Sequence, residues 1–275
     1  MSRNSGYKVK DVTGMQNIMF DLMPRRSDSE VYMNNKIDVT EFVKFIKKEQ
    51  RKNKDLTYFH GFLAILGKTL YKYPSLNRYV QNRTLFMHYD VTLGFVAKAE
   101  FNEKSEEFMA CLKINKDDNI YKISDNIKKK IDDIRDTSKR HTDGANDIID
   151  KVGHLWRPFR SLIVGFLKWV DKKFELPKSF ADENIYYTSL MVSNLGTFKT
   201  GAIYHHLTEL GTCSGIITFG EIKEENKRYY MEMGLTMDER IADGFLFCKA
   251  MKSIEYLFNN PEILKEDVNK DFEEK

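Results

Sequence analysis

Three segments of this 275-residue chain carry side chains that could share one reaction. The residues are Glu239 and Asp243 in LTMDERIADG, Ser193 and Asn194 in VSNLG, and His205 and His206 in TGAIYHHLTELG. A carboxylate or an imidazole can act as the general base that removes a proton from an attacking thiol or hydroxyl. A serine hydroxyl can donate a hydrogen bond to the oxyanion that this attack creates. The chemistry expected from these residues is attack on a carbonyl, provided that the fold brings them together.

Each of these residues also has a purely structural interpretation. The Ser193 hydroxyl can bond to the backbone at a strand-to-turn junction, and Asp243 can be the N-cap of the helix that follows it. Glu239 can be a fixed anion beside a basic residue. His205 and His206 can be loop histidines with solvent or backbone partners.

The composition is that of a soluble globular protein, with 41% hydrophobic and 31% charged residues. A net charge of +3 without an arginine-rich cluster gives no argument for nucleic acid. Cys111, Cys213 and Cys248 lie far apart, which favours a reducing compartment over disulfides or a zinc site, and no metal site is expected. The N-terminal MSRNSGYKVK lacks the apolar core of a signal peptide. We therefore expect a cytoplasmic protein.

Hydrophobic periodicity predicts helices and strands in mixed order. The expected strands are residues 31–39, 85–98, 107–114, 184–194, 213–222 and 228–237, and the expected helices are residues 39–52, 56–73, 120–134 and 244–260. Asp38 and Glu41 form a capping-box pattern before the first helix. His60 lies in a helix that is apolar nearly all round, so we expect a hydrogen-bonded core histidine. Several hairpin-like strand pairs favour an α+β fold over a doubly wound sheet.

The chain is expected to form a single domain over residues 21–265. Residues 1–20 are polar and lack a clear period, which predicts an irregular, flexible N-terminal segment. Residues 266–275 are mostly charged, which predicts a frayed tail.

Residues 154–174, HLWRPFRSLIVGFLKWVDKKF, form an amphipathic segment. Its longest uncharged run, SLIVGFL, is far shorter than the roughly 18 apolar residues that a membrane span requires. Apolar residues recur at helical spacing, with a basic fringe of Arg157, Arg160, Lys168, Lys172 and Lys173. We expect this helix to pack against the core or another subunit. The alternative is a helix that lies on a membrane surface.

The order of the segments resembles a known family. DVTEF, LTYFHGFLAILGKTLYKYPSLNRYV, VTLGFVA, VSNLG, GIITFGEI, MDERIADG and FLFCKAMKSIEYLFNNPEIL follow one another as in the catalytic domain of dihydrolipoyl acyltransferases. These are the core subunits of 2-oxoacid dehydrogenase complexes, and chloramphenicol acetyltransferases are their relatives. The resemblance covers roughly residues 20–265. The helix at 154–174 is similar to an insertion in stand-alone bacterial relatives that lack lipoyl domains.

The resemblance implies a chloramphenicol acetyltransferase-like fold, a mixed sheet flanked by helices, assembled as a homotrimer with sites between subunits. It implies a small-molecule acyl donor, coenzyme A or acyl-CoA, as substrate and no covalently bound cofactor. The acceptor, a thiol or a hydroxyl, would enter from the opposite end of a channel. No lipoyl or subunit-binding domain is expected before residue 20, so a lipoyl arm would come from another chain.

The resemblance also assigns roles to particular residues. Ser193 matches the serine that donates to the oxyanion, and Asn194 follows it as a substrate-binding residue. Asp243 matches the aspartate that holds the local structure, usually through an arginine. Arg25 or Arg26 would be its salt-bridge partner.

Glu239 occupies the position of the family's catalytic histidine. A thiol pKa near 8.5 lies about 2 units above that of histidine and about 4 above that of glutamate, so an unperturbed glutamate makes proton removal costlier by roughly 3 kcal/mol. Burial would raise the carboxyl pKa and recover much of this difference, whereas a neighbouring arginine would lower it. His205 and His206 could line the channel or supply a base instead. The sequence is therefore compatible with an acyltransferase, or with a trimeric scaffold that binds CoA or acyl thioesters without turnover.

Overall fold

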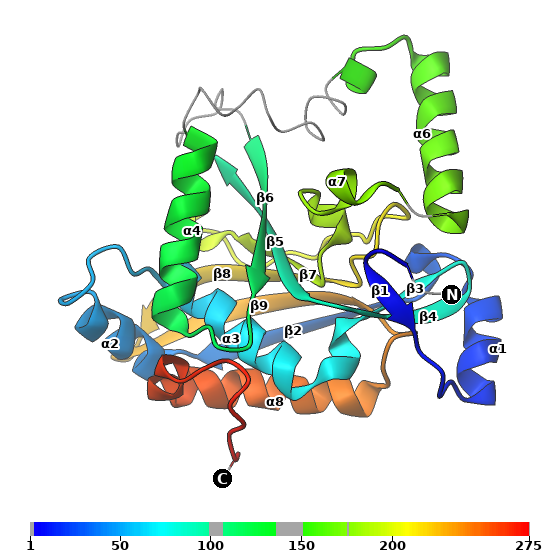
Figure 1. Cartoon of the computed structure of the whole chain (residues 1–275). Helices are drawn as coiled ribbons and strands as arrows, with labels where there is room; N and C mark the ends of the chain where they lie inside the picture. The colour runs from blue at the N-terminus through cyan, green and yellow to red at the C-terminus, as the bar shows by residue number, and fades with distance from the viewer. Residues whose placement is uncertain (1–2, 99–106, 136–150, 175, 275) are drawn as a thin grey trace.

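The strands form two sheets in the computed structural model, which describes residues 3–98, 107–135, 151–174 and 176–274 (Figure 1). The strands are β1 (Gly6–Lys8), β2 (Glu30–Asp38), β3 (Arg78–Gln81), β4 (Thr84–His88), β5 (Val91–Lys98), β6 (Glu107–Ile114), β7 (Leu190–Asn194), β8 (Gly215–Glu225) and β9 (Arg228–Asp238). The large sheet has six strands in the order β2-β9-β8-β7-β5-β6. The small sheet has the order β1-β4-β3.

The large sheet is mixed, as the resemblance implies. β7 runs parallel to both of its neighbours, β5 and β8, whereas β2, β6 and β9 are joined by antiparallel pairing. The β3–β4 and β8–β9 hairpins close through Asn82–Arg83 and Asn226–Lys227, and all four of these residues have positive φ. Two consecutive left-handed residues match the right-handed twist of the strands, and asparagine tolerates this conformation well.

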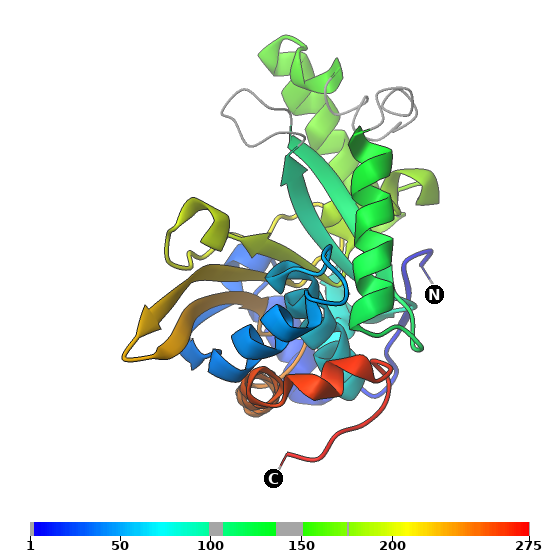
Figure 2. The same ribbon diagram turned by 90° about the vertical axis from the view of Figure 1, so that its left-hand side faces the viewer.

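Helices cover one face of the large sheet. The helices are α1 (Gly14–Leu22), α2 (Thr40–Glu49), α3 (Tyr58–Lys72), α4 (Ile120–Arg135), α6 (Arg157–Lys173), α7 (Lys178–Ala181) and α8 (Gly244–Asn259), with 3-10 turns η1 (Arg26–Asp28), η2 (Pro74–Asn77), η4 (Ile185–Tyr187), η5 (Gly196–Phe198) and η6 (Pro261–Lys265). α2, α3 and α8 lie together beneath the sheet, and α4 stands against β6 (Figures 1 and 2). The mixed sheet and this helical layer confirm the α+β expectation.

Aromatic rings join the helices to the sheet. Phe62 on α3 stacks on Phe219 of β8 with ring centroids 4.3 Å apart, and Phe42 of α2 lies 5.1 Å from Phe258 of α8. Gly61 lets α2 and α3 approach, because a Cβ there would stand 2.5 Å from the Phe42 ring. Aromatic pairs at such separations contribute about 0.5–1.5 kcal/mol beyond the area that they bury. The apolar periodicity of these helices is therefore explained by one shared core.

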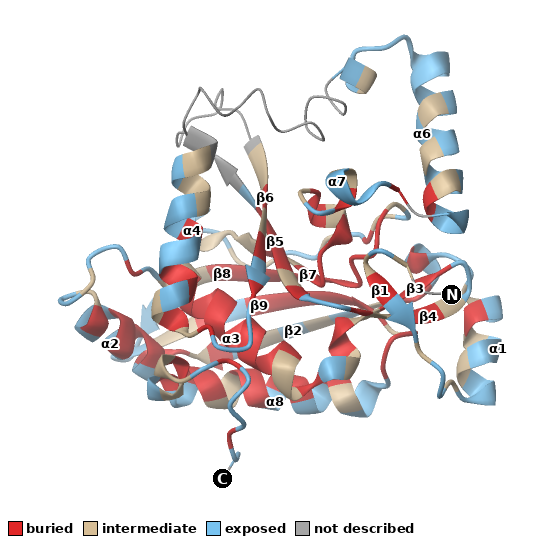
Figure 3. Ribbon diagram, viewed as in Figure 1, coloured by how far each residue is buried: buried red, intermediate tan, exposed pale blue. Residues whose placement is uncertain are grey.

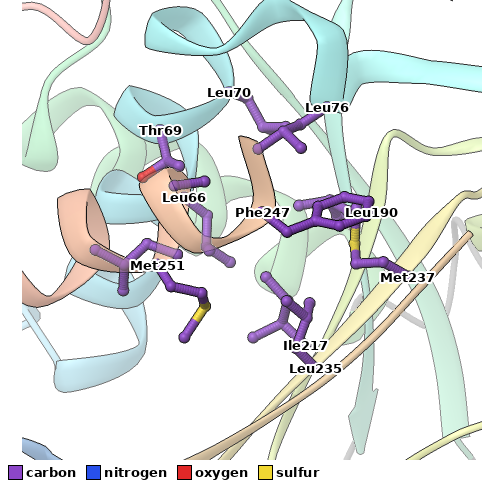
Figure 4. A pocket seen from close by; sticks show the side chains of 12 residues that line it. Leu66, Thr69, Leu70, Leu76, Leu190, Ile217, Leu235, Met237, Phe247 and Met251 are labelled. Atoms are coloured by element: carbon purple, nitrogen blue, oxygen red, sulfur yellow. The ribbon is translucent and has the colours of Figure 1, made fainter. Parts of the chain in front are cut away.

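The same layer contains a small apolar cavity of about 30 Å³ between α3, α8 and the sheet (Figure 4). Its lining residues are Leu66, Thr69, Leu70, Leu76, Leu190, Ile217, Leu235, Met237, Phe247, Ala250, Met251 and Ile254. The single polar side chain among them, Thr69, already donates its hydroxyl hydrogen to Ile65 O at 2.8 Å. This cavity is a packing void rather than a polar site.

The start of the first helix differs from the expected capping box. Asp38 does accept hydrogen bonds from Thr40 N at 2.9 Å and Thr40 Oγ1 at 2.6 Å. Glu41 instead pairs with Lys44 at 2.8 Å. His60 behaves as expected, buried with Nδ1 2.8 Å from Ser124 Oγ.

Residues 6–8 and 14–22 form regular elements, whereas an irregular segment is expected over residues 1–20. β1 pairs with β4, and α1 begins with a capping box. In that box Gln16 N donates to Thr13 Oγ1 at 3.2 Å, and Thr13 N donates to Gln16 Oε1 at 3.0 Å. Phe20 is 2% exposed. Both elements are shorter than ten residues, too short for periodicity to indicate them.

The single strand expected over residues 85–98 is in fact two strands in different sheets. β4 belongs to the small sheet and β5 to the large one, with a turn at Tyr89 and Asp90 between them. The C-terminal tail also differs from the expectation of fraying. Val268 and Phe272 are buried, and Lys68 Nζ donates to Asp267 O at 2.8 Å.

α6 does not pack its apolar face on the core of its own chain. The expectation that residues 154–174 pack against the core is therefore wrong. The helix stands beside the body and is exposed along most of its length (Figure 3). Leu167 and Val170, near its C-terminal end, pack against a small cluster that contains Leu176 and Tyr187. Among the helices that the structure describes, none is long and apolar enough to cross a membrane.

Candidate functional site

Ser193 lies near the end of β7 and lines a cavity of about 690 Å³. Side chains alternate along the strand, so Leu190 and Val192 enter the core while Met191 and Ser193 face the opposite side. Within the described residues, the Ser193 hydroxyl has no hydrogen-bond partner, in contrast to the backbone-bonded serine of the structural interpretation. It is therefore an available donor at the wall of the cavity.

The cavity lies where β5 and β7 meet the N-terminal end of α3, and Ile131 of α4 also lines it. Its lining residues are Thr57, Tyr58, Phe59, Gly94, Phe95, Val96, Ile131, Ile185, Met191, Val192, Ser193, Asn194, Thr197, Phe198, His205 and Ile216. Most of the wall is apolar, and its polar side chains include those of Ser193, Asn194 and His205. A mostly apolar cavity with a few convergent polar groups is typical of a small-molecule site.

Asn194 shapes the turn after Ser193. Its Oδ1 accepts a hydrogen bond from Gly196 N at 3.2 Å. Gly196 is required at this point, because a Cβ there would stand 2.9 Å from Gly220 O. The S-N-x-G spacing thus has a local structural reason, while Asn194 also remains in the cavity wall.

His205 reaches the cavity from a segment that crosses the sheet face. Thr218 Oγ1 donates to Ile203 O at 2.6 Å, and Glu221 N donates to Thr200 O at 2.8 Å. Gly234 makes room for this crossing, since a Cβ there would stand 2.9 Å from Ile203 O. The structure therefore brings Ser193 and His205 into one cavity within a single chain.

His206 lies away from that cavity, beside the start of β2. Its Nδ1 is 3.0 Å from Glu30 Oε2, and its side chain is 87% exposed. Glu30 also accepts hydrogen bonds from Leu207 N at 2.6 Å and Tyr32 Oη at 2.5 Å. Burial raises the pKa of Glu30, but these hydrogen bonds outweigh it and hold the pKa below its usual value. The sequence gives no indication of this carboxylate–histidine pair, because its members are 176 residues apart.

Glu239 lies between the two members of a buried ion pair. Asp238 is 0% and Arg240 3% exposed, with Nε and Nη2 of the guanidinium 2.8 and 2.7 Å from the carboxylate oxygens. Ser29 Oγ donates to the same carboxylate at 2.9 Å, and Glu239 N donates to Ser29 O at 2.9 Å. The backbone at Glu239 is therefore fixed on both sides. Arg240 is engaged by Asp238, so it is not the basic partner that the fixed-anion interpretation of Glu239 requires.

Glu239 and Ser193 are far apart in one chain. Ser193 pairs with Thr218 on β8, which pairs with Gly234 on β9, and Glu239 follows five residues further along. Two strand spacings of about 4.8 Å and five residues of about 3.4 Å place them about 20 Å apart. His206 lies at the same end of the sheet as Glu239, because its partner Glu30 is paired with Asp238.

Asp243 does not pair with either arginine named from the sequence. Its carboxylate caps α8 and accepts from Leu246 N at 2.8 Å, as in the N-cap interpretation. Arg25 pairs with Asp28, and Arg26 donates to Thr208 O and Gly211 O. The expected salt bridge is therefore wrong within the chain. The local structure is held instead by Asp238 and Arg240, through a D-x-R spacing just before the Asp243 position.

Comparisons with known proteins agree with this architecture. The family model for the 2-oxoacid dehydrogenases acyltransferase catalytic domain matches residues 4–147. A probable dihydrolipoamide acetyltransferase from Listeria monocytogenes has 15% identity and a TM-score of 0.59, with 92% of this chain and 94% of that chain covered. The cubic core of the pyruvate dehydrogenase multienzyme complex has 12% identity and a TM-score of 0.61, with 94% of each chain covered.

A chloramphenicol acetyltransferase has 10% identity and a TM-score of 0.56, with 91% of this chain and 98% of that chain covered. At such identities, the similarity to these three structures establishes the fold alone. A comparison with curated protein sequences found no match.

Proposed function

Because the chain belongs to the family of 2-oxoacid dehydrogenase acyltransferase catalytic domains, we propose that it transfers an acyl group from acyl-CoA or another acyl thioester to a thiol or hydroxyl acceptor. The observation that carries the proposal is the unpartnered Ser193 hydroxyl in a large, mostly apolar cavity. That hydroxyl is placed to donate to a developing oxyanion, and such donors contribute about 10²–10³-fold to rate.

The reaction has two steps at the carbonyl. A base takes the proton of the acceptor as its sulfur or oxygen attacks the thioester carbon, and Ser193 donates to the resulting oxyanion. The tetrahedral intermediate then collapses, the carbon–sulfur bond to CoA breaks, and the CoA thiolate receives the proton from the base. Asn194 and His205, in the same wall, are proposed to contact the substrates.

The base has to come from one of two places. His205 shares the cavity with Ser193 in one chain. Glu239 lies about 20 Å away along the sheet, so it could act only across a subunit boundary. His206 lies outside the cavity wall, beside Glu30. We therefore propose a homotrimer in which Glu239, in the position of the family's histidine, faces the Ser193 cavity of the next subunit. At reference pKa values histidine is the better base for a thiol, since glutamate carries the penalty of roughly 3 kcal/mol.

Exposed apolar residues on α1 support an assembly. Met15, Ile18 and Leu22 are 69, 55 and 71% exposed at helical spacing on one side of that helix. A side of this kind is commonly covered by another subunit. Light scattering should give about three times the chain mass of 32.3 kDa.

The test is CoA release from acetyl-CoA with a panel of thiols and alcohols. Ser193→Ala should lower kcat by about 10²–10³-fold, whereas the exposed Ser27→Ala is the matched control and should leave it unchanged. Glu239→Gln, His205→Gln and His206→Gln then identify the base by which of them abolishes the rate. Tight CoA binding without release for any acceptor would instead establish the non-catalytic binding protein.

A further inference from the structure

Asp171, the only acidic residue of α6, joins the last turn of this helix to the rest of the protein by hydrogen bonds. Asp171 is 0% exposed, and its carboxylate accepts hydrogen bonds from Tyr187 Oη at 2.8 Å, Gln81 Nε2 at 3.0 Å and Gly211 N at 3.0 Å. Arg26 closes the ring, since its Nη2 donates to Gly211 O at 2.6 Å and Gln81 Oε1 at 3.4 Å. A buried hydrogen-bond network of this kind holds a helix in one direction.

The rest of α6 presents a stripe of large apolar side chains to solvent. Phe159, Leu162, Phe166 and Trp169 recur at steps of three and four residues, and their exposures are 59, 71, 59 and 49%. Trp156 extends the stripe beyond the start of the helix, with its ring 5.8 Å from that of Phe159. Aromatic residues in such number are unusual on an exposed helix and indicate an interaction surface.

The basic side chains of α6 lie in solvent, whereas its acidic side chain is buried. Its five basic residues are all exposed, and none of them forms an ion pair within the described part of the chain: Arg157, Arg160, Lys168, Lys172 and Lys173. Asp171, the one acid, is turned inward. A helix with an aromatic stripe and only cations in water is complementary to an apolar layer bounded by anions.

A basic cleft of about 370 Å³ lies between α6 and the body. Its lining residues are Pro24, Arg25, Arg26, Val80, Gln81, Asn82, Arg83, Lys168, Trp169, Lys172, Glu209 and Arg240. Arg25, Arg83 and Arg240 have acidic partners nearby, and Glu209 accepts from Arg26 N at 2.7 Å. Lys168 and Lys172 remain without such partners among the described residues.

Arg26 gives a second, independent sign of an anionic ligand in this cleft. The residue is only 2% exposed, yet its Nε–H has no hydrogen-bond partner in the described structure. A buried donor without an acceptor is costly, and a phosphate oxygen in the cleft would satisfy it.

We propose that α6 and the cleft at its base dock the protein onto a membrane surface that carries anionic phospholipids. The stripe enters the boundary between headgroups and acyl chains, and Lys168, Lys172 and Arg26 contact lipid phosphates. Trp169 belongs to both the stripe and the cleft, so the two parts form one surface. The helix is about 25 Å long and lies along the surface without crossing it. A second copy of the chain offers no overall charge complementarity, because each copy carries a net charge of +3.

The test is co-sedimentation of the full chain with vesicles. The protein should pellet with vesicles of phosphatidylcholine and phosphatidylglycerol, should stay in solution with phosphatidylcholine alone, and should be released by salt. Lys168→Glu with Lys172→Glu should weaken binding at least about 30-fold. Phe166→Ser with Trp169→Ser should weaken it at least about tenfold.

Matched controls separate this surface from general effects. Lys54→Glu with Lys129→Glu changes two exposed lysines elsewhere, and Tyr89→Ser removes an exposed aromatic residue from the turn between β4 and β5. Both controls should bind vesicles within about twofold of the natural chain, with unchanged circular dichroism. The proposal fails if the natural chain stays in solution with anionic vesicles, or if the controls lose as much binding. It also fails if Phe166→Ser with Trp169→Ser lowers the oligomeric mass, since the stripe would then be a subunit contact.

Discussion

Replacing Asp238 with alanine should destabilise the protein strongly, because the change leaves the buried guanidinium of Arg240 without its anionic partner. Asp238 and Arg240 are 0 and 3% exposed, and the carboxylate meets the guanidinium through two hydrogen bonds of 2.8 and 2.7 Å. It also accepts from Ser29 Oγ at 2.9 Å. Removing one partner of a buried pair typically costs about 3–5 kcal/mol. A domain is stable by only about 5–15 kcal/mol, so the variant should be marginal.

Urea unfolding followed by far-UV circular dichroism is the suitable assay. Fluorescence would mislead, since the two tryptophans, Trp156 and Trp169, are 71 and 49% exposed at α6 and report little on the core. Protein concentration has to be equal across variants, because assembly adds to apparent stability. The matched control is Asp28→Ala, which breaks an aspartate–arginine pair whose Arg25 side chain is 70% exposed. The control should lose much less stability.

A double variant distinguishes a stranded charge from lost packing. Asp238→Leu with Arg240→Met removes both charges and keeps side-chain volume, so it should recover most of the stability that Asp238→Ala loses. The reasoning is refuted if Asp238→Ala costs less than about 1 kcal/mol, or if the double variant is less stable than the alanine variant. Either result would mean that the Arg240 guanidinium finds other partners, and that the backbone at Glu239 is not held by this pair.

Two further predictions concern the core. Burial lowers the pKa of His60 to about 4, so this residue's contribution to stability is present above pH 6.5 and declines as the pH falls towards 4, by about 2 kcal/mol at pH 5. His60→Gln should therefore flatten this part of the pH profile in unfolding titrations, and an unchanged profile would contradict the assignment. Leu66→Ala should cost less than Leu63→Ala, within the usual range of about 2–5 kcal/mol, because Leu66 already faces the void of about 30 Å³ while Leu63 is not among its lining residues. Equal losses in urea unfolding would show that the void is filled in solution.

The long elements of the fold were predictable because each has one strong period. The helix predicted over residues 56–73, which is apolar nearly all round, corresponds to α3. The segments with alternating apolar residues correspond to β2, β8 and β9. The small sheet was not predictable, since its strands have only three to five residues. The turn at Tyr89 and Asp90, which separates β4 from β5, contains neither glycine nor proline to indicate it. The burial of the tail was not predictable either, because Val268 and Phe272 are isolated apolar residues that contact the distant helices α3 and α8. Short or isolated signals acquire meaning only from tertiary contacts.

The site was predictable only where its geometry is local. Ser193 in S-N-x-G and the cap at Asp243 follow from turns of a few residues, and the structure shows the turn and cap directly. The ion pair between Asp243 and Arg25 or Arg26 was wrong. The buried ion pair here is formed by Asp238 and Arg240, which are only two residues apart. The Glu30–His206 contact joins segments far apart in sequence, and no spacing rule reaches that distance. Both Ser193 and Glu239 lie beyond the residues that the family model matches.

The pairing of β7 has a consequence for the order in which the molecule folds. β7 is five residues long, and both of its neighbours are parallel to it, so no tight turn can bring it to either of them. Leu190 pairs with Leu93, 97 residues earlier, whereas the β8–β9 and β3–β4 hairpins close across two residues. Contacts between distant segments form late, because the loop entropy has to be overcome first. Pulse-labelled hydrogen exchange during refolding should therefore find β8 and β9 protected before β7. A chain that has not finished folding would then have no serine cavity at all.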